Sequence, residues 1–347
     1  MIKVGIMGST GYVGSELIRI LYTHPKVEIK TITSKNHNNQ VFNSVYQNFN
    51  KIHEMKCEDN EIEKIANELD IIFLALPHGV TSKIITKQLL DDVKIIDLSA
   101  DFRLKSVDLY EKWYNIKHDK GFLLERAVYG LSEWKRKQIV SSSLISNPGC
   151  YPTCTLLCLL PLIKEGIIEE DNIIVDAKSG VTGAGRNLAL TTHFSECNES
   201  IKAYNILSHR HTPEIEEQLS ELGGNNISIT FTTHLVPMNR GILCTCYGNL
   251  KKAYDYDALK KIYEKYYQNE FFIRLTKKDV FPETKWVKGS NYCDIGFTVD
   301  EKTGKVIIIG AIDNLIKGAA GQAVQNMNLM FNLDENMGLQ SIPMFPI

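Results

Sequence analysis

The chain has 347 residues, which is enough for two domains that each form a hydrophobic core. Hydrophobic residues make up 44% of the chain and charged residues 23%, values that are ordinary for a soluble globular protein. The formal net charge of −2 provides no basic field for nucleic acid and no polybasic membrane patch, and no apolar run is long enough to span a membrane. No targeting segment is visible, so we expect a cytoplasmic protein that binds neither nucleic acid nor membranes.

The first predicted elements belong to a nucleotide-binding domain. Residues 2–7 form a short apolar strand, and residues 15–21 have helical periodicity. Between them lies a glycine-rich loop, Gly8-Ser9-Thr10-Gly11-Tyr12-Val13-Gly14. A strand, a glycine loop and a helix in this order let the backbone approach a pyrophosphate at the helix start. The spacing G-x-x-G-x-x-G differs from the usual G-x-G-x-x-G, so a glycine-rich turn of another α/β protein is the alternative.

The second predicted strand, residues 27–33, indicates which dinucleotide binds. It ends in Ser34-Lys35-Asn36, where an NAD-specific site usually has an acidic residue for the ribose hydroxyls. Hydroxyl, ammonium and amide groups suit a 2′-phosphate instead. We therefore predict NADP(H) as the cofactor, with Ser34 and Lys35 among its contacts. A solvated polar loop is the alternative.

Two continuous apolar runs, residues 71–76 and 94–98, predict further strands of a parallel sheet that is covered on both faces. Ligands of such sheets bind at the carboxyl ends of the strands. Pro77, directly after the first run, is therefore a candidate cofactor contact. Arg103, shortly after the second, is a candidate for binding a phosphate or carboxylate, although an arginine in such a loop is more often structural.

The most distinctive stretch is Ser146-Asn147-Pro148-Gly149-Cys150-Tyr151-Pro152-Thr153. A short apolar strand, residues 143–145, precedes it and an apolar helix follows it, so Cys150 is predicted at a strand-to-helix turn where unpaired N–H groups favour a thiolate. A free thiol with a pKa of about 8.5 is only a few per cent ionised at neutral pH, and a helix end contributes less than about one pKa unit. Cys150 therefore needs a basic partner, for which a histidine is the best candidate. An inert buried cysteine is the alternative.

The other seven cysteines predict neither disulfides nor a metal site. Cys154 and Cys158 follow Cys150 at intervals of four residues on one helix face, and Cys244 and Cys246 share one face of a strand. The sequence has no Cys-x-x-Cys pair. We interpret these residues as core or surface side chains in a reducing compartment.

The pattern changes after Cys150. A strand at residues 172–177 leads into the loop 178–186, which is rich in backbone donors and ends in Arg186. Further predicted elements are antiparallel strands at 227–236, 242–249, 293–299 and 305–312, a helix at 257–268, and an apolar helix at 318–331 after Asp313-Asn314.

The predicted fold class is α/β, with two domains. An N-terminal Rossmann-type nucleotide-binding domain spans residues 1–148 and is completed by a C-terminal helix at 315–347. An α+β catalytic and oligomerisation domain with a mixed or antiparallel sheet spans residues 149–314.

The remaining chemical cluster is His209-Arg210-His211-Thr212-Pro213-Glu214. In extended backbone, residues two apart point the same way, so both imidazoles can face one pocket. Thr212 and Pro213 suit a helix cap and first turn. No third metal ligand stands at a recognisable spacing, and a pair of surface histidines is the alternative.

Taken together, these motifs resemble the N-acetyl-γ-glutamyl-phosphate reductase family, which is similar in fold and chemistry to aspartate-semialdehyde dehydrogenase. The resemblance covers nearly the whole chain. Its most specific parts are Asn-Pro-Gly-Cys-Tyr-Pro-Thr at 147–153 and His-Arg-His-Thr-Pro-Glu at 209–214, and it extends to Asn314–Asn328.

The resemblance implies an NADPH-dependent reduction of N-acetyl-L-glutamyl 5-phosphate to the 5-semialdehyde in arginine biosynthesis, through a thioester on Cys150. One histidine of the pair would activate the thiol; we favour His211 slightly, with Glu214 as an orienter. A homo-oligomer, either a dimer or a tetramer, is expected. Candidate cofactor contacts are Gly8, Ser9, Thr10, Gly11, Tyr12, Val13, Gly14, Ser34, Lys35, Pro77 and Asn314. Candidate substrate contacts are Asn147, Ser179, Gly180, Arg103 and Arg186.

Three other functions are compatible with the sequence. The first is a related enzyme acting on another acyl phosphate, such as aspartyl phosphate. The second is a cysteine hydrolase with a merely structural glycine loop. The third is a nucleotide-binding regulator without catalysis.

Overall fold

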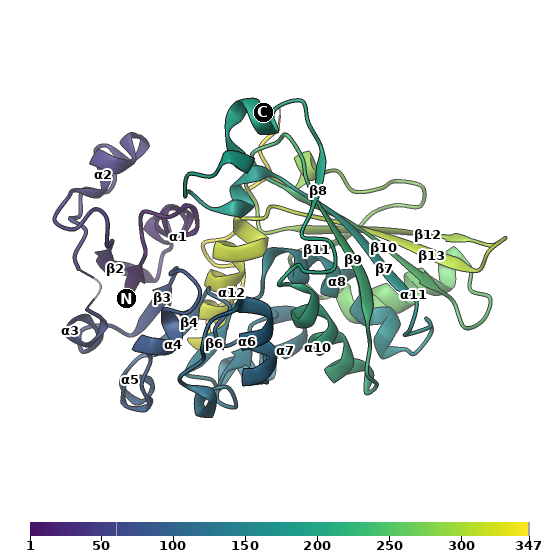
Figure 1. The fold of residues 1–347 in the computed structure, drawn as a ribbon, viewed down its shortest axis with the longest axis horizontal. Helices are drawn as coiled ribbons and strands as arrows, with labels where there is room; N and C mark the ends of the chain where they lie inside the picture. Colours follow the sequence, from purple (N-terminus) through teal and green to yellow (C-terminus); the bar gives the residue numbers. More distant parts are fainter. Residues whose placement is uncertain (60, 346–347) are drawn as a thin grey trace. The chain divides into compact units, whose positions relative to one another are not determined.

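The computed structural model, which describes residues 1–59 and 61–345, divides into two units (Figure 1). Unit 1 comprises Met1–Pro148 and Ala319–Gln340. Unit 2 comprises Gly149–Gly318 and the residues from Ser341 onward. The chain therefore passes between the units directly before Gly149 and directly after Gly318.

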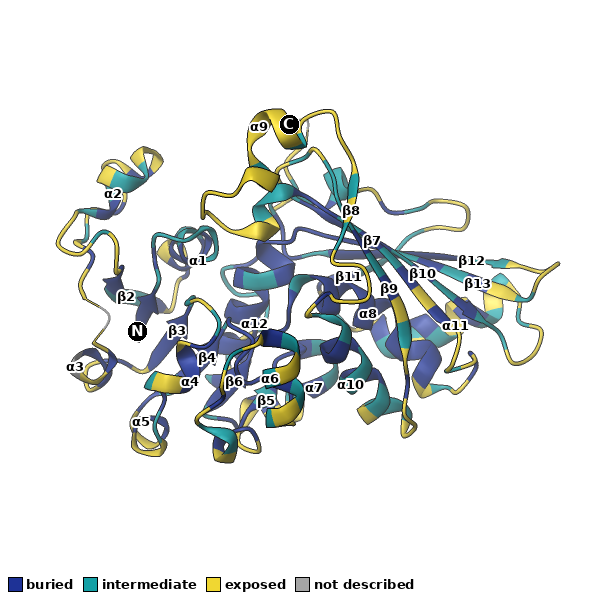
Figure 2. Ribbon diagram, in the orientation of Figure 1, coloured by how far each residue is buried: buried dark blue, intermediate teal, exposed yellow. Residues whose placement is uncertain are grey.

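Unit 1 contains a six-stranded sheet with the order β2-β1-β3-β4-β6-β5, in which every described pairing is parallel. Its strands are β1 (Ile2–Met7), β2 (Val27–Thr33), β3 (Ile71–Leu74), β4 (Lys94–Asp97), β5 (Val128–Tyr129) and β6 (Leu144–Ser146). All four residues of β3 are buried, as expected for a strand covered on both faces (Figure 2).

The helices of unit 1 connect these strands. They are α1 (Tyr12–Tyr22), α2 (Phe42–Val45), α3 (Ile62–Ala66), α4 (Thr81–Ile84), α5 (Lys87–Asp92), α6 (Val107–Tyr114), α7 (Ser132–Val140) and α12 (Gly321–Met330). The last of them returns from the far end of the chain and packs against α1 and α7.

Unit 2 contains a seven-stranded mixed sheet with the order β11-β12-β13-β10-β7-β9-β8. The pairings β7–β9 and β11–β12 are parallel and the others are antiparallel. The strands are β7 (Ile173–Ser179), β8 (Lys202–Tyr204), β9 (Ile229–Leu235), β10 (Ile242–Asn249), β11 (Ile273–Leu275), β12 (Cys293–Asp300) and β13 (Lys305–Ile312). The predicted fold class is confirmed: α/β, with a parallel sheet in one unit and a mixed sheet in the other.

Burial alternates along β10, so one face of this sheet is covered. Cys244 and Cys246 are fully buried on the face toward α8, whereas Thr245 and Tyr247 on the opposite face are partly exposed. The helices of unit 2 are α8 (Cys150–Lys164), α9 (Phe194–Cys197), α10 (Thr212–Gly223) and α11 (Tyr256–Tyr267). Shorter turns are η1 (Gln47–Phe49), η2 (Gly121–Leu123), η3 (Val181–Ala184), η4 (Leu190–Thr192), η5 (Thr284–Trp286) and the π-helical η6 (Ile316–Ala320).

In the described part of the chain, we find no helix long and apolar enough to cross a membrane.

The expected helix at 315–347 is wrong beyond Met330, where α12 ends. The backbone turns left-handed at Asn332 (φ 53°), directly after the cap residue Phe331. Residues 346 and 347 of that expected range lie outside the described residues.

Helix α12 is buried along its whole length, and it is held by buried amides as well as by apolar side chains. Asn326 Nδ2 donates to the Gly130 carbonyl (2.8 Å) and to Asn147 Oδ1 (3.2 Å), and Asn326 Oδ1 accepts from the Ser132 hydroxyl (2.7 Å). Gln322 Nε2 also donates to Gly130 and Ser132. These bonds attach α12 to the segment that leads to residue 147.

We expect Asn326→Ala to lower the free energy of unfolding by about 1–3 kcal/mol, because it removes the buried hydrogen bonds to Gly130, Ser132 and Asn147. Chemical denaturation measures this loss. Gln138→Ala removes an exposed amide from α7 and should cost about 0.5 kcal/mol or less. Equal losses in the two variants would contradict the assigned role of the buried network.

Candidate active site

Cys150 is the first residue of α8, as the turn motif predicted, and it is partly exposed. Gly149 precedes the helix in extended conformation, and its carbonyl accepts hydrogen bonds from both the backbone N–H and the hydroxyl of Thr153 (2.9 Å each). The Gly149 N–H donates to Glu214 Oε1 (2.8 Å), and Glu214 is buried. Glu214 in the first turn of α10 therefore fastens the start of α8.

The π-helical turn η6 presses directly on Cys150. A Cβ atom placed on Gly318 would lie 2.8 Å from the Cβ of Cys150. The turn is organised by the buried Asp313, whose Oδ1 accepts from the N–H groups of Leu315 (2.9 Å) and Ile316 (3.1 Å). π-helical turns are rare in proteins, and those that occur are frequently found at functional sites. The contact of η6 with Cys150 therefore supports a functional role for this cysteine.

Both predicted histidines pack against the residue that follows Cys150. The ring centroid of Tyr151 lies 5.4 Å from that of His209 and 6.0 Å from that of His211, both edge to face. The two imidazole centroids are 4.9 Å apart. The two imidazoles therefore adjoin each other, although the backbone at His211 is helical (φ −81°, ψ −11°) and not extended as we had assumed. That both face one pocket stays a prediction. Helix α10 begins at Thr212, so His211 occupies the cap position that we had predicted for Thr212.

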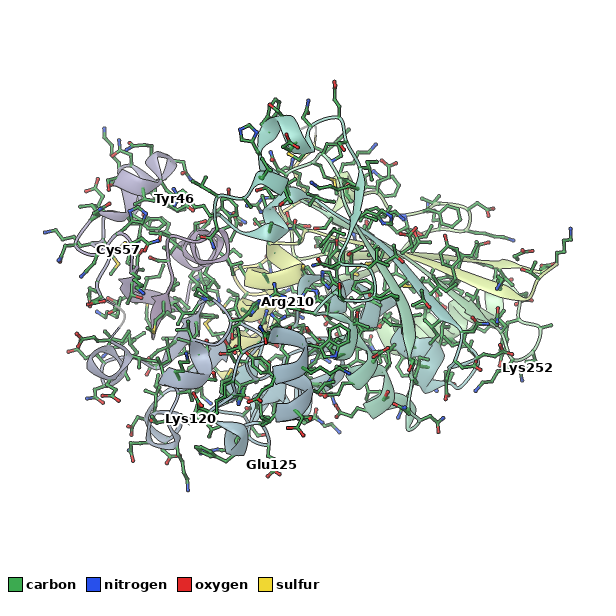
Figure 3. All side chains as sticks on the ribbon, viewed as in Figure 1. Tyr46, Cys57, Lys120, Glu125, Arg210 and Lys252 are labelled. Atoms are coloured by element: carbon green, nitrogen blue, oxygen red, sulfur yellow. The ribbon has the colours of Figure 1, made fainter. Side chains whose placement is uncertain are left out.

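The two histidines differ in their hydrogen bonds and charge. The His211 backbone N–H donates to His209 Nδ1 (3.1 Å), which leaves Nε2 as the protonated nitrogen of a neutral His209 ring. Burial, and then the neighbouring Arg210 charge, lower the pKa of His209 to about 4. His209 is therefore neutral near pH 7. Arg210 itself is exposed, and Figure 3 labels it between β8 and α10.

A pair of tyrosines completes the surroundings of Cys150. The hydroxyls of Tyr151 and Tyr204 lie 3.0 Å apart. Burial raises the pKa of Tyr204 to about 12 and raises that of Tyr151 further, and a charge on Cys150 adds to both shifts. Both phenols therefore stay protonated at neutral pH. Sequence reasoning missed this pair, because Tyr204 reaches Tyr151 through the pairing of β8 with β9 and has no local motif.

The loop after β7 is held in place by Asn314. Its Nδ2 donates to Thr182 Oγ1 (3.0 Å), and its Oδ1 accepts from the Gly241 N–H (2.8 Å). Both ends of the amide thus fix the loop that contains the candidate substrate contacts Ser179 and Gly180. A contact of Asn314 with the cofactor stays a prediction. Arg186, at the end of the loop, is exposed.

In unit 1, the glycine loop is a bare backbone cradle. Gly8 has φ +80°, and the N–H groups of Gly8 and Ser9 both donate to the Thr33 carbonyl at the end of β2 (3.1 and 2.9 Å). A Cβ on Gly14 would lie 2.3 Å from the Gly8 carbonyl oxygen. A loop with glycine at these tight positions lets the backbone at the start of α1 approach a dinucleotide pyrophosphate.

The expected adenosine end of this cradle has hydroxyl groups. Thr10 Oγ1 and Ser34 Oγ lie 2.7 Å apart, so two candidate cofactor contacts adjoin each other. Tyr46, which Figure 3 labels, lies on the segment after β2. Its hydroxyl donates to the Thr10 carbonyl (3.1 Å). Sequence reasoning missed Tyr46, whose position depends on the fold of a segment without a motif. Lys35, beside Ser34, is exposed, and Pro77 follows β3 closely; their cofactor contacts stay predictions.

Arg103 is buried, and its guanidinium group donates hydrogen bonds to backbone carbonyls. Its Nε donates to the Asn147 carbonyl (2.9 Å) and its Nη2 to the Leu98 carbonyl (3.1 Å). The Asn147 side chain donates to the Ala319 carbonyl (3.1 Å). Arg103 therefore supports the end of unit 1 that leads to Cys150, and substrate contacts of Arg103 and Asn147 stay predictions.

The cysteine side chains form no disulfide, and six of them are buried. Among the described residues, no group of three His, Cys, Asp or Glu side chains is arranged to hold a metal ion.

Comparisons with known proteins show which proteins this chain is similar to. Residues 3–142 match the family model of the semialdehyde dehydrogenase NAD binding domain, and residues 150–314 match that of the semialdehyde dehydrogenase dimerisation domain. A curated N-acetyl-gamma-glutamyl-phosphate reductase of Lachnoclostridium phytofermentans is 54% identical over 100% of both chains. One from Campylobacter jejuni serotype O:2 is 52% identical over 98% of both chains.

Solved structures show the same fold at low identity. Aspartate semialdehyde dehydrogenase II of Vibrio cholerae, complexed with ASA, has a TM-score of 0.72 at 16% identity, covering 96% of this chain and 98% of its own. The Candida albicans enzyme with NADP has a TM-score of 0.68 at 16% identity, covering 96% of this chain and 99% of its own.

We expect Gly318→Ala to displace Cys150, because the new Cβ would overlap the Cys150 Cβ and lie 3.2 Å from its Cα. The sulfur would lose its place at the start of α8, which favours the thiolate. Alkylation of Cys150 by iodoacetamide, followed by peptide mass spectrometry, should slow several-fold at pH 7.

Gly248→Ala is the matched control, since its Cβ would meet Ile168 at an ordinary 3.4 Å. It should leave the alkylation rate unchanged. Wild-type alkylation kinetics in a folded Gly318→Ala protein would show that η6 does not set the position of the sulfur.

Proposed function

The chain belongs to the N-acetyl-γ-glutamyl-phosphate reductase family, and we propose that it reduces N-acetyl-L-glutamyl 5-phosphate to the 5-semialdehyde with release of phosphate. Members of this family are NADP-dependent oxidoreductases, and the chain uses NADP(H). The observation that carries the proposal is the partly exposed Cys150 at the start of α8, followed directly by Tyr151, against which the imidazole pair packs. The reaction would be a cytoplasmic step of arginine biosynthesis.

The proposed chemistry begins at the Cys150 sulfur. Its thiolate attacks the acyl carbon, and the bond to the phosphate oxygen breaks, so phosphate leaves and a thioester remains. NADPH, when bound, supplies a hydride to the thioester carbonyl. The resulting thiohemiacetal collapses, releasing the aldehyde and restoring the Cys150 thiolate. The bare cradle Gly8–Gly14, with Thr10 and Ser34 beside it, would hold the cofactor.

His211 is the better candidate for proton transfer. His209 stays neutral near pH 7 and accepts the His211 N–H, so its role is to position its neighbour. This asymmetry supports the slight preference for His211 that the sequence suggested. Glu214, which binds the Gly149 N–H, would fix the thiol against the base. Ser179 and Gly180 are candidates for binding the oxyanion or phosphate, with Arg186, Arg103 and Asn147 as further substrate contacts.

A homo-oligomer, a dimer or a tetramer, forms part of the proposal. The match of residues 150–314 to a dimerisation domain supports it, together with the partly exposed face of the unit 2 sheet that contains Tyr247, Ile307 and Ile309.

Mixing the protein with N-acetylglutamyl 5-phosphate in the absence of NADPH should release phosphate in a burst equal to the number of sites. Mass spectrometry should find the N-acetylglutamyl group on the peptide that contains Cys150, because without a hydride the thioester accumulates. Cys150→Ala should give neither burst nor adduct.

Cys154→Ala, one turn further along α8 and buried, should retain both signals. Aspartyl phosphate serves as the competing substrate. Faster turnover of aspartate semialdehyde than of the N-acetylated aldehyde in the reverse reaction would overturn the substrate assignment. Ester hydrolysis without any nucleotide would instead support a cysteine hydrolase.

The two histidines should respond differently to substitution. His211→Asn should lower kcat by roughly 10²–10⁴-fold, the usual contribution of a general acid or base. His209→Asn should cost only about tenfold or less, because the asparagine Oδ1 can still accept the His211 N–H. Steady-state kinetics of both variants provide the measurement.

The pH dependence gives an independent check. With a folded pKa near 4 against about 6.5 unfolded, His209 takes up its proton mainly in the unfolded chain between these values, so stability falls as pH decreases from about 6.5 to about 4. His209→Asn should flatten that part of the stability curve. It should leave the kcat/KM profile between pH 6 and 8 unchanged, and loss of the wild-type profile in this variant would refute the assignment.

A further inference from the structure

An ion pair in unit 2 lies outside the reaction steps assigned to Cys150 and the histidines. Arg240 Nη1 lies 3.5 Å from Asp313 Oδ2. The Asp313 carboxylate is fully buried and the Arg240 side chain is only 22% exposed, so water and salt screen this pair less than a pair on the surface. Such a pair holds together the two segments from which its residues come.

Asp313 organises the segment that touches the nucleophile. Its Oδ1 accepts from the N–H groups of Leu315 (2.9 Å) and Ile316 (3.1 Å), and its backbone carbonyl accepts from the Gly318 N–H (3.0 Å). The last of these bonds spans five residues, as in a π-helix. Since Gly318 packs on Cys150, the place of Asp313 and the place of the sulfur are set together.

Arg240 lies in the turn between β9 and β10, and this turn holds the loop after β7. Three backbone carbonyls of the turn accept from three successive N–H groups of that loop. The pairs are Gly241 with Gly180 (2.9 Å), Met238 with Val181 (2.9 Å) and Asn239 with Thr182 (3.2 Å). Gly180 is a candidate contact for the oxyanion or phosphate of the substrate. The place of Arg240 and the place of this loop are therefore also set together.

The Asp313 carboxylate does not depend on Arg240 for its hydrogen bonds. Its Oδ2 also accepts from the Gly289 N–H (2.8 Å), so three backbone N–H groups bind the carboxylate. Removal of the Arg240 guanidinium therefore leaves the turn η6 formed and the sulfur in place. The pair adds an attraction between η6 and the β9–β10 turn, beside the clamp that Asn314 makes to Gly241.

We propose that Arg240 and Asp313 are positioning residues, whose ion pair holds the loop after β7 at the distance from the Cys150 sulfur that acyl transfer requires. Reacting atoms must lie about 3–3.5 Å apart, and a displacement of about 1 Å can lower the rate roughly 10²-fold. Because Asn314 shares the task, loss of the pair should cost less than this full factor. The inference rests on the proposed function, since the loop binds a substrate anion only in that reaction.

The test is a double-mutant cycle of Arg240→Met, Asp313→Asn and the double variant. Arg240→Met removes the charge and keeps a long apolar side chain. Asp313→Asn removes the opposite charge, and its remaining oxygen can still accept from the first N–H groups of η6. The measured quantity is the rate constant of the phosphate burst from N-acetylglutamyl 5-phosphate without NADPH, which reports acyl transfer alone.

Arg240→Met should lower the burst rate roughly tenfold, and Asp313→Asn at least as much, because it also loses the bond from Gly289. The double variant should be no slower than Asp313→Asn, since both changes remove the same pair. Arg240→Lys, which keeps the charge, should recover most of the lost rate. The control, Arg136→Met, removes an ion pair with Glu335 in unit 1 and should leave the burst rate unchanged.

Alkylation of Cys150 by iodoacetamide separates this role from a general loss of structure. Arg240→Met should react at the wild-type rate at pH 7, because η6 stays formed. A variant that is slow in the burst but normal in alkylation has a correctly placed sulfur and a displaced loop. Slow alkylation of Arg240→Met would show that the pair only supports η6, and it would overturn the assignment.

The remaining outcomes each decide a defined point. Losses that multiply in the double variant show that the two residues act independently, and they overturn the pair. A raised KM with an unchanged maximal burst rate in Arg240→Met identifies a direct substrate contact and overturns the positioning role.

Should Asp313→Asn fail to fold, the comparison of Arg240→Met with Arg240→Lys replaces the cycle, and an equal loss in both refutes the role of the charge. A wild type that gives no burst refutes the proposed function. A wild-type burst that persists unchanged in the variants refutes the pair alone.

Discussion

The hydrogen bond from the Gly149 N–H to the buried carboxylate of Glu214 is the contact on which the candidate site depends. It joins the first turns of two helices, α8 with Cys150 and α10 with the histidine pair just before it. A carboxylate at two helix starts also meets the positive ends of both helix dipoles. The bond therefore adds a polar contact to the packing of α8 on α10 and of Tyr151 on the two histidines, and it fixes together nucleophile and base, which lie 59 or more residues apart in the chain.

The aromatic residues and histidines near the Cys150 sulfur differ in their proposed roles: some position their neighbours, and one transfers protons. Tyr151, Tyr204 and His209 enclose the site with rings that keep their neutral form near pH 7. A neutral aromatic environment does not compete with the substrate phosphate for charge, and it leaves a single imidazole, that of His211, for acid–base work. The lowered pKa of His209 and its acceptance of the His211 N–H separate two histidines that look equivalent in the sequence.

Sequence reasoning predicted the features that local chemistry determines. The glycine loop, the strand-to-helix turn at Cys150 and the buried parallel strands all depend on residues that are adjacent in the chain. It could not foresee Tyr46, the Tyr151–Tyr204 contact, or the clamp that Asn314 makes between Gly241 and Thr182, since these arise from strand pairing and loop packing. The buried attachment of Arg103 to backbone carbonyls is of the same kind, because an arginine in a loop looks the same whether it binds a ligand or the chain itself.

The end of the last helix separates a prediction that followed the residue pattern from one that went beyond it. The apolar run predicted a helix to residue 331, and α12 ends at Met330, just before the left-handed Asn332. The longer expected range, 315–347, has polar residues at 332 and 334–336 and no helical apolar pattern to support it.

The position of Cys150 places a steric requirement on unit 2. Gly318, the last residue of unit 2 before the chain returns to unit 1, packs on Cys150, and a Cβ at 318 would lie 2.8 Å from the Cβ of Cys150. The proposed reaction needs the sulfur at the start of α8, where the unpaired N–H groups favour a thiolate. Residue 318 must therefore lack a side chain, since a Cβ there would displace the sulfur.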